Sequence, residues 1–240
     1  MSRTVFDSIY DVVPNKTSDP IALVMLPGAG MHARDFMAQG FITPIRDRGL
    51  AVDVVMVDIE ADGYMHEAFN EHLKNEVVEP LLARGYRRVW FAGISLGAYG
   101  AIRFLREKVK AVEGMMLLSP FLSTRGAVGK VLREGGLDHW CPHPRDHEND
   151  DWEMLCWLKE NLVPDGFPVT IHVGWGASDR YADAGRLLAG RLPSERVFCI
   201  PGDHDWHTWN TLWHDMLDAL TFPFPDVPAG SAWQQGIRPS

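Results

Sequence analysis

Residues 89–101 read V-W-F-A-G-I-S-L-G-A-Y-G-A, an apolar run followed by Gly93-Ile94-Ser95-Leu96-Gly97 and then by small residues. The apolar run predicts a buried strand, and the small residues predict a helix packed closely on the sheet. A G-x-S-x-G pattern in that context predicts that Ser95 lies on a sharp strand-to-helix turn with its hydroxyl exposed. The two glycines would remove β-carbons that collide with the neighbouring strand and helix. The alternative is a buried serine that only shapes the turn.

Other mainly apolar runs predict further strands that are buried on both faces. They are Ile21–Leu26, Val52–Val57, 115–118, 169–173 and Val197–Ile200, with a weaker strand expected within 4–12. Amphipathic segments at 65–83, with a kink at Pro80, and after Ser95 predict helices between them. Strands that alternate with helices predict an α/β fold, with a mostly parallel central sheet and helices on both faces.

Length and composition predict one compact domain. The chain has 240 residues, of which 46% are hydrophobic and 23% charged, so it can bury most of the surface of its unfolded state. Residues 121–168 are rich in Gly, Pro, His and Asp, and one helical piece is expected at 151–162. We therefore predict a single domain over 1–220 with a lid-like insertion at 121–168, followed by a proline-rich tail over 221–240.

Charge and cysteine content exclude several classes of function. A formal net charge of -9 argues against nucleic acid or an anionic membrane as the main partner. The first residues lack the pattern of a secretion signal, and no apolar stretch is long enough to cross a bilayer. Three scattered cysteines are too few for a disulfide framework. We expect a cytoplasmic protein, and the sequence leaves its oligomeric state open.

A serine nucleophile needs a histidine that takes its proton and a carboxylate that orients the histidine. Asp179 follows the strand predicted at 169–173 and precedes a helix expected near Tyr181, which makes it our candidate for the acid. Asp183 is the alternative acid, although it falls within that helix. A helix cap is the structural alternative for Asp179.

Two histidines follow the strand Val197–Ile200. From Trp206 onward, helical spacing places Trp209 and Trp213 on an apolar face and His207 on the polar face. His204 stays in the preceding loop, free to turn inward. The geometry required of a general base favours His204 over His207.

The oxyanion formed by attack on a carbonyl needs backbone N–H donors. Leu96, at the start of the helix after the serine, should supply one of them. The other should come from the loop Pro27-Gly28-Ala29-Gly30-Met31, with Ala29 as first choice and Gly30 next. A plain turn is the alternative for this loop, and neither common phosphate-binding pattern is present.

Two clusters in the insertion have open interpretations. His139, Cys141, His143 and His147 lie close in sequence and could hold zinc, but interleaved prolines and the lack of a second paired element argue against a metal. Tryptophans 140, 152 and 157 could line an apolar acyl pocket or pack within the lid.

The order of these features resembles the α/β-hydrolase superfamily over about residues 21–220, and the elbow looks like those of small bacterial carboxylesterases. The motifs are L-P-G-A-G, G-I-S-L-G, G-A-S-D and G-D-H-D-W. The resemblance implies a triad of Ser95, Asp179 and His204, oxyanion donors at Ala29 and Leu96, and a lid after the strand at 115–118. Two features depart from the family: Pro-Gly stands where many members have His-Gly, and only one weak strand precedes Ile21.

The resemblance implies hydrolysis of a small carboxylic ester or thioester through an acyl-serine intermediate, without a metal or organic cofactor. Dehalogenases and epoxide hydrolases of this fold need a carboxylate where Ser95 stands. Acyltransferases, peptidases and carbon–carbon bond hydrolases use the same triad, so the sequence does not separate them. The alternative from another class is a noncatalytic small-molecule-binding protein on the same scaffold.

Overall fold

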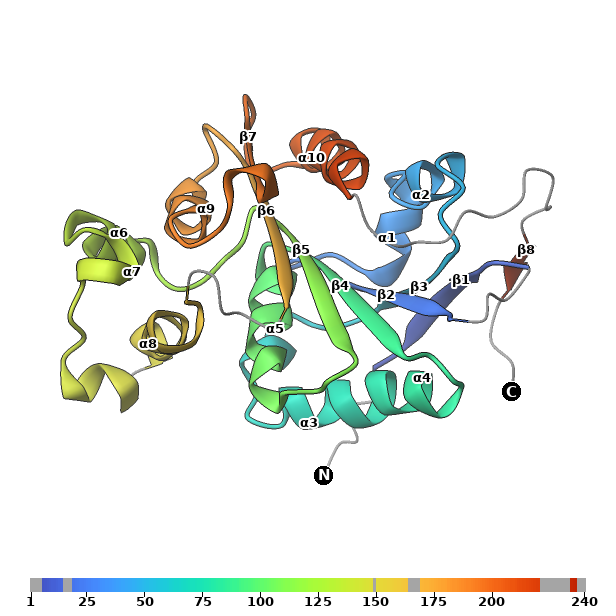
Figure 1. The fold of residues 1–240 in the computed structure, drawn as a ribbon, viewed down its shortest axis with the longest axis horizontal. Helices are drawn as coiled ribbons and strands as arrows, with labels where there is room; N and C mark the ends of the chain where they lie inside the picture. The colour runs from blue at the N-terminus through green and yellow to red at the C-terminus, as the bar shows by residue number, and fades with distance from the viewer. Residues whose placement is uncertain (1–5, 15–18, 149, 164–168, 221–233, 237–240) are drawn as a thin grey trace.

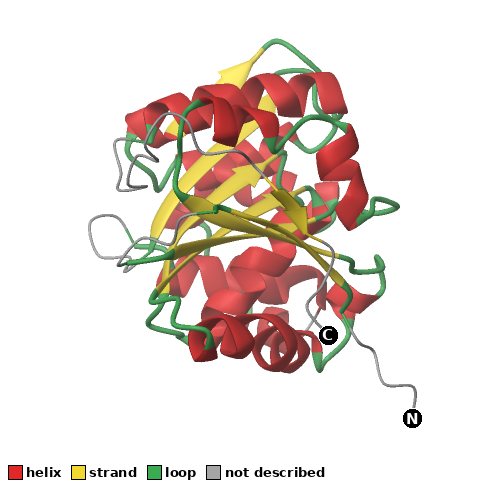
Figure 2. Ribbon diagram, turned by 90° about the vertical axis from the view of Figure 1, so that its right-hand side faces the viewer, coloured by secondary structure: helices red, strands yellow, loops and turns green. Residues whose placement is uncertain are grey.

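An eight-stranded sheet forms the centre of the molecule, with helices on both of its faces (Figures 1 and 2). This computed structural model describes residues 6–14, 19–148, 150–163, 169–220 and 234–236. The strands are β1 (Ser8–Val12), β2 (Ile21–Leu26), β3 (Val52–Val57), β4 (Arg88–Ile94), β5 (Val112–Leu118), β6 (Thr170–Gly176), β7 (Val197–Ile200) and β8 (Gln234–Gly236).

The strand order is β7-β6-β5-β4-β2-β3-β1-β8. Strands β2 to β7 pair in parallel, whereas β1 is antiparallel to both β3 and β8. The prediction of an α/β fold with a mostly parallel sheet is therefore confirmed. Strand β8 was not predicted, and the rest of the predicted tail lies outside the described residues.

The helices form two layers (Figure 1). One face of the sheet carries α1 (Ala33–Ala38), α2 (Thr43–Asp47) and α10 (Trp206–Ala219). The other carries α3 (Phe69–Leu73), α4 (Glu79–Ala83), α5 (Leu96–Phe104) and α9 (Ala182–Ala189). The short turns are η1 (Gly63–Met65), η3 (Leu105–Glu107) and η5 (Ser194–Arg196).

The helix layers on both faces of the sheet explain why its strands are mainly apolar. In β2, Val24 and Leu26 pack into the core beside α5, whereas Leu23 and Met25 pack into the core beside α10. All six residues of β2 are buried. Successive side chains of a strand point to opposite faces, so a strand covered on both sides, such as β2, is apolar on both faces.

The segment predicted as one kinked helix at 65–83 is divided in the structure. Helix α3 passes into a π-helical turn, η2 (Lys74–Val78), which leads into α4. Pro80 lies in the first turn of α4. Proline has no N–H to donate to the carbonyl one turn earlier, and the wider π turn relieves this mismatch.

The segment 121–168 contains more helix than predicted. In addition to α8 (Asp150–Asn161), which corresponds to the expected helical piece, it forms α6 (Arg125–Arg133), α7 (Gly136–His139) and η4 (Pro144–Glu148). Gly126 and Gly129 lower the helix propensity of α6, which is instead stabilised by burial of Val128 and Val131. The prediction of a single helical piece was therefore wrong, while the role of the segment as a lid stays a prediction.

Side chains of the two clusters in this segment make local contacts. His139 Nδ1 and Cys141 Sγ hydrogen-bond to backbone carbonyls at 3.1 and 3.7 Å, and His143 Nδ1 accepts a bond from a backbone amide. The side chain of His147 lies outside the described part. Trp140 is buried and stacks on Trp152, with ring centroids 5.9 Å apart.

Within the described residues, no helix combines the length and the apolar character needed to cross a membrane.

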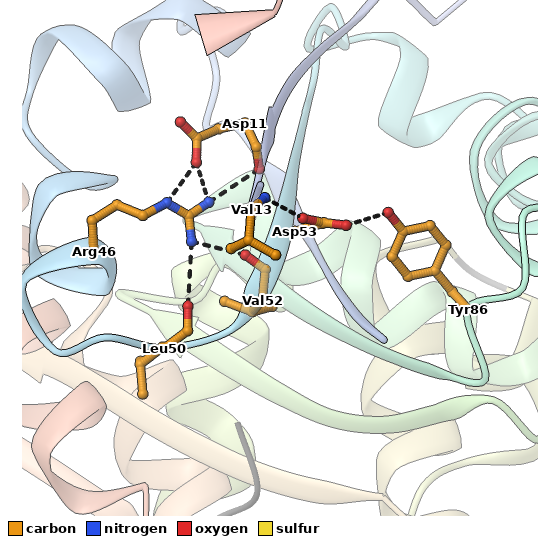
Figure 3. A network of polar contacts seen from close by, with 7 residues as sticks. All are labelled: Asp11, Val13, Arg46, Leu50, Val52, Asp53 and Tyr86. Carbon is orange, nitrogen blue, oxygen red and sulfur yellow. Dashed lines mark hydrogen bonds and ion pairs between the residues drawn. The ribbon is translucent and has the colours of Figure 1, made fainter. Parts of the chain in front are cut away.

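Two charged side chains tie the antiparallel edge to the rest of the sheet (Figure 3). Asp53, buried in β3, accepts hydrogen bonds from the Val13 amide at 2.6 Å and from the Tyr86 hydroxyl. Burial, followed by this bond, raises the pKa of Tyr86, so the hydroxyl keeps its proton and remains a donor. Beside it, Arg46 of α2 pairs with the Asp11 carboxylate and donates to backbone carbonyls.

Replacing Asp53 with Leu should lower the free energy of unfolding by about 1–3 kcal/mol or more, because it leaves a buried amide and hydroxyl unpaired. Urea denaturation at pH 7 measures the loss. Asp53→Leu combined with Tyr86→Phe should recover part of it, since one unpaired donor disappears. Asp47→Ala, at an exposed carboxylate, is the matched control with little effect. A urea midpoint for Asp53→Leu equal to that of wild type would contradict the stabilising role of Asp53.

His172 of β6 is a buried titratable side chain. Its ring centroid lies 6.3 Å from that of Trp90 and 6.4 Å from that of Phe198. Nδ1 has no hydrogen-bond partner among the described residues. Burial, and secondarily the charge of Arg196, lowers the pKa of His172 from 6.5 to about 4. The folded protein therefore holds this imidazole in its neutral form.

Because the unfolded chain binds a proton at His172 below about pH 6.5 and the folded chain does so only near 4, acid should destabilise the fold across that window. The loss attributable to this group approaches about 3 kcal/mol at pH 4. Urea unfolding at a series of pH values should show a shallower decline for His172→Phe than for wild type. His214→Phe, at an exposed position, should follow the wild-type curve. Parallel curves for all three proteins would refute the assignment.

Candidate active site

Ser95 lies between the end of β4 and the start of α5, in a strained backbone conformation. Its φ is 53° and its ψ is -110°, outside the regions that most side chains adopt. The Ser95 amide donates to the Leu118 carbonyl at 2.9 Å, and the Ser95 carbonyl accepts from the Phe121 amide at 3.1 Å. These bonds to the residues around the end of β5 hold the turn in place. The structure therefore shows the sharp strand-to-helix turn that the sequence predicts.

The two glycines of this turn are required by close backbone contacts. A β-carbon on Gly93 would lie 2.5 Å from the Gly97 carbonyl oxygen, and one on Gly97 would overlap the Leu26 carbonyl group. Helix α5 thus begins in direct backbone contact with the ends of β4 and β2. The G-x-S-x-G pattern predicts this requirement for both glycines.

Three side chains from three separate loops form one hydrogen-bonded chain. His204 Nε2 lies 3.0 Å from Ser95 Oγ, and His204 Nδ1 lies 2.8 Å from one Asp179 oxygen and 3.0 Å from the other. The Asp179 side chain is fully buried and that of His204 is 9% exposed. The order serine, histidine, carboxylate allows a proton to move from the hydroxyl to the imidazole while the carboxylate stabilises the resulting charge.

Asp179 is held in its charged form. Burial alone would raise its pKa, but hydrogen bonding to His204, together with the Ser119 hydroxyl and the Tyr181 amide, brings the pKa of Asp179 below its ordinary value. The amide bond is 2.7 Å long. The Ser119 hydroxyl is buried and lies beside this carboxylate.

The two less favoured candidates lie elsewhere. Asp183 is in α9, where its carboxylate bonds to the exposed Arg186 at 2.6 Å. His207 is exposed in the first turn of α10. The structure brings neither into the chain of hydrogen bonds that contains Ser95.

The imidazole of His204 is held between two aromatic rings that were not predicted to belong to the site. The ring centroid of Tyr181 lies 5.1 Å away and that of Trp209 lies 5.0 Å away, both in edge-to-face geometry. Trp209 belongs to the apolar face of α10, and that pattern showed burial without showing which neighbour it contacts. The two rings restrict the rotation of the imidazole and shield it from water.

Ser119 was also missed. It follows β5 with φ 45° and is fully buried, and its amide donates to the Gly174 carbonyl at 2.7 Å. No local motif marks such a serine. Its position is set only by the pairing of β5 with β6, whose next loop carries Asp179.

The loop after β2 runs beside the serine. A β-carbon on Gly28 would lie 3.4 Å from the Ser95 β-carbon, so this loop passes next to Ser95 at Gly28. Tyr64 anchors this loop through a hydrogen bond of 2.7 Å from its hydroxyl to the Pro27 carbonyl. The backbone amides of Ala29 and Leu96 have no hydrogen-bond partner among the described residues. Both are therefore available to donate to a ligand.

Comparison with known proteins gives matches in structure but not in sequence. No protein-family model matches the chain, and no curated protein matches it by sequence. A fluorophosphonate-binding serine hydrolase from Staphylococcus aureus superposes with a TM-score of 0.59 at 18% identity, covering 87% of each chain. An S-formylglutathione hydrolase from Agrobacterium tumefaciens gives a TM-score of 0.61 at 15% identity, covering 90% of each chain.

A lipase-esterase related protein from Clostridium acetobutylicum gives a TM-score of 0.55 at 10% identity, over 90% of this chain and 100% of that one. At such low identity, these likenesses establish the arrangement of helices and strands. The chain therefore has the fold of the α/β-hydrolase superfamily, as its sequence motifs predicted.

Proposed function

We propose that this protein is a serine hydrolase that cleaves a small carboxylic ester or thioester through an acyl-serine intermediate. The observation that carries the proposal is the chain of hydrogen bonds from Ser95 through His204 to Asp179. Two amides free to donate lie beside the serine, and the structural neighbours include proteins named as serine hydrolases and esterases.

In the first step Ser95 Oγ attacks the acyl carbon while His204 Nε2 takes its proton. The carbonyl oxygen becomes an oxyanion, which accepts hydrogen bonds from the amides of Leu96 and Ala29. His204 then gives the proton to the leaving oxygen or sulfur as the bond between it and the acyl carbon breaks. The product alcohol or thiol departs, and the acyl group remains esterified to Ser95.

In the second step a water molecule loses a proton to His204 and attacks the acyl-serine. Collapse of the second oxyanion returns the proton to Ser95 Oγ and releases the carboxylic acid. Asp179 stays charged throughout, because its lowered pKa keeps it a carboxylate that stabilises the imidazolium. These steps use only protein groups, substrate and water.

A fluorophosphonate probe should label the wild-type protein at Ser95, because its phosphorus is attacked by an activated serine in the same geometry. Ser95→Ala should abolish labelling, as read by in-gel fluorescence and by intact mass. Ser194→Ala removes an exposed hydroxyl and should leave labelling unchanged. Failure to label the folded wild type would instead support a noncatalytic ligand-binding protein.

Substitutions of His204 and His207 should differ clearly in their effect on kcat. His204→Ala should lower kcat for p-nitrophenyl acetate at least about a thousandfold, since it removes the base and leaves only oxyanion stabilisation. His207→Ala should stay within about twofold of wild type, because an exposed side chain outside the triad makes no contact with the reacting groups. The reverse pattern would overturn the choice of base.

A further inference from the structure

The loop after β2 is held by hydrogen bonds at two successive peptide groups. The first joins Pro27 to Gly28, and its carbonyl accepts from the Tyr64 hydroxyl at 2.7 Å while its N–H donates to Met31 Sδ at 3.1 Å. The second joins Gly28 to Ala29, and its carbonyl accepts from the Met31 amide at 3.1 Å. In a trans peptide the N–H points away from the carbonyl, so the Ala29 N–H points away from the Met31 amide.

Tyr64 is the partner in this set that comes from outside the loop. It belongs to η1 and is fully buried. Burial, followed by the negative charge of Asp58, raises the pKa of Tyr64 well above its ordinary value, so the hydroxyl keeps its proton and remains a donor. On its other side the Pro27 carbonyl faces α5, where a β-carbon on Gly97 would lie 2.8 Å from the Pro27 oxygen. The first peptide group is therefore held between the start of α5 and Tyr64.

Helix α5 also holds Tyr64 itself. A β-carbon on Gly100 would lie 2.6 Å from two carbons of the Tyr64 ring, so the glycine leaves the space that the ring occupies. In the same helix, the Arg103 guanidinium donates to the Tyr64 carbonyl at 2.6 Å and to the His66 carbonyl at 2.9 Å. These contacts fix η1 to the helix that begins directly after Ser95.

Both candidate oxyanion donors are thus referred to one helix. The Leu96 amide belongs to the first residue of α5, and the Ala29 amide is reached from α5 through Tyr64 and Pro27. Ala29 and Gly30 are exposed, and Gly30 has a φ of 72°, so the tip of the turn is not held by side-chain packing of its own. A donor stabilises an oxyanion only where it points at the developing charge, and small misplacements are costly.

From these observations we propose that Tyr64 is a positioning residue, whose hydroxyl aligns the Ala29 amide with the oxyanion that forms at Ser95. This inference rests on the proposed function and adds to it a residue that acts through the loop and not by contact with the substrate. Tyr64 transfers no proton and forms no covalent bond. Because an oxyanion forms in both steps, the alignment serves acylation and deacylation alike.

The substitution Tyr64→Phe removes the hydroxyl and keeps the ring. The kcat for p-nitrophenyl acetate should fall about ten- to thirtyfold while KM changes less than about threefold, because the donor acts on the transition state. The fall is smaller than the hundredfold or more expected for losing a donor, since the amide stays and only loses its alignment. Tyr86→Phe is the matched control. It also removes a hydrogen-bonded hydroxyl from a buried tyrosine, away from the site, and should leave kcat unchanged.

A transition-state analogue separates alignment from a purely structural role. Ser95 Oγ adds to the carbonyl carbon of 1,1,1-trifluorohexan-2-one, its proton passes to His204, and the carbonyl oxygen becomes an oxyanion. The inhibition constant of this ketone should rise in Tyr64→Phe by about the factor by which kcat/KM falls. A folded Tyr64→Phe protein with a lower urea midpoint but wild-type kcat and a wild-type inhibition constant would overturn the proposal.

Hydrogen exchange distinguishes this proposal from the proposed activity, because it needs no substrate. The amides of Gly28 and Met31, followed by NMR, should exchange at least about tenfold faster in Tyr64→Phe than in wild type or Tyr86→Phe, since the loop opens more often without its anchor. If wild type hydrolyses no ester while these amides exchange faster in Tyr64→Phe, the esterase proposal fails and the anchoring of the loop by Tyr64 stands. An active wild type whose exchange and kcat are unchanged by Tyr64→Phe would refute the role of Tyr64 alone.

Discussion

The backbone contact between the start of α5 and the end of β2 is the constraint on which the candidate site depends. Gly97 lies against the Leu26 carbonyl so closely that no β-carbon fits between them. This contact sets the entry of the helix, and with it the positive φ of Ser95 and the direction of the serine hydroxyl. It also places the loop after β2 beside Ser95, so one backbone contact positions both the proposed nucleophile and the loop that carries the candidate oxyanion donor Ala29.

The rest of the site follows from parallel strands. Because β2 to β7 run the same way, the segments after their carboxyl ends share one edge of the sheet. Asp179 and His204 reach Ser95 from β6 and β7 along that edge, whereas a cavity lined by Asp58, Glu60 and Asp62 lies at its opposite end beside β3. Asp179 and His204 therefore lie on one side of Ser95 in the strand order, and the strands β2 and β3 lie on the other.

Much of this arrangement could be predicted from the sequence, because a strand that is buried on both faces is recognisable as a mainly apolar run. β2 and β3 were predicted with their observed bounds, and the triad candidates were found because each follows such a run. The contacts of Tyr181 and Trp209 with His204 could not be found in this way, since they depend on packing between elements. The same holds for Ser119, whose position is set by strand pairing.

Other differences between the sequence prediction and the structure also arise from contacts between separate segments. Helix α6 was missed because Gly126 and Gly129 conceal its periodicity, and its stability comes from tertiary burial. The cavity was missed because its wall combines residues near positions 6, 32, 58 and 69, which the fold brings together from separate segments. The net charge of the sequence counts the carboxylates of this cavity but does not show that they lie close together.

The π turn between α3 and α4 keeps the buried face of this helical segment turned toward the sheet. Phe69, Leu73, Val77 and Leu81 recur every four residues, and all are buried in one core. At 100° per residue a regular α-helix would rotate each successive member by about 40° away from the last. One wider turn reverses part of that drift. The helical segment thereby stays in phase with the sheet, so that Phe69 at its start and Leu81 near its end pack into the same core.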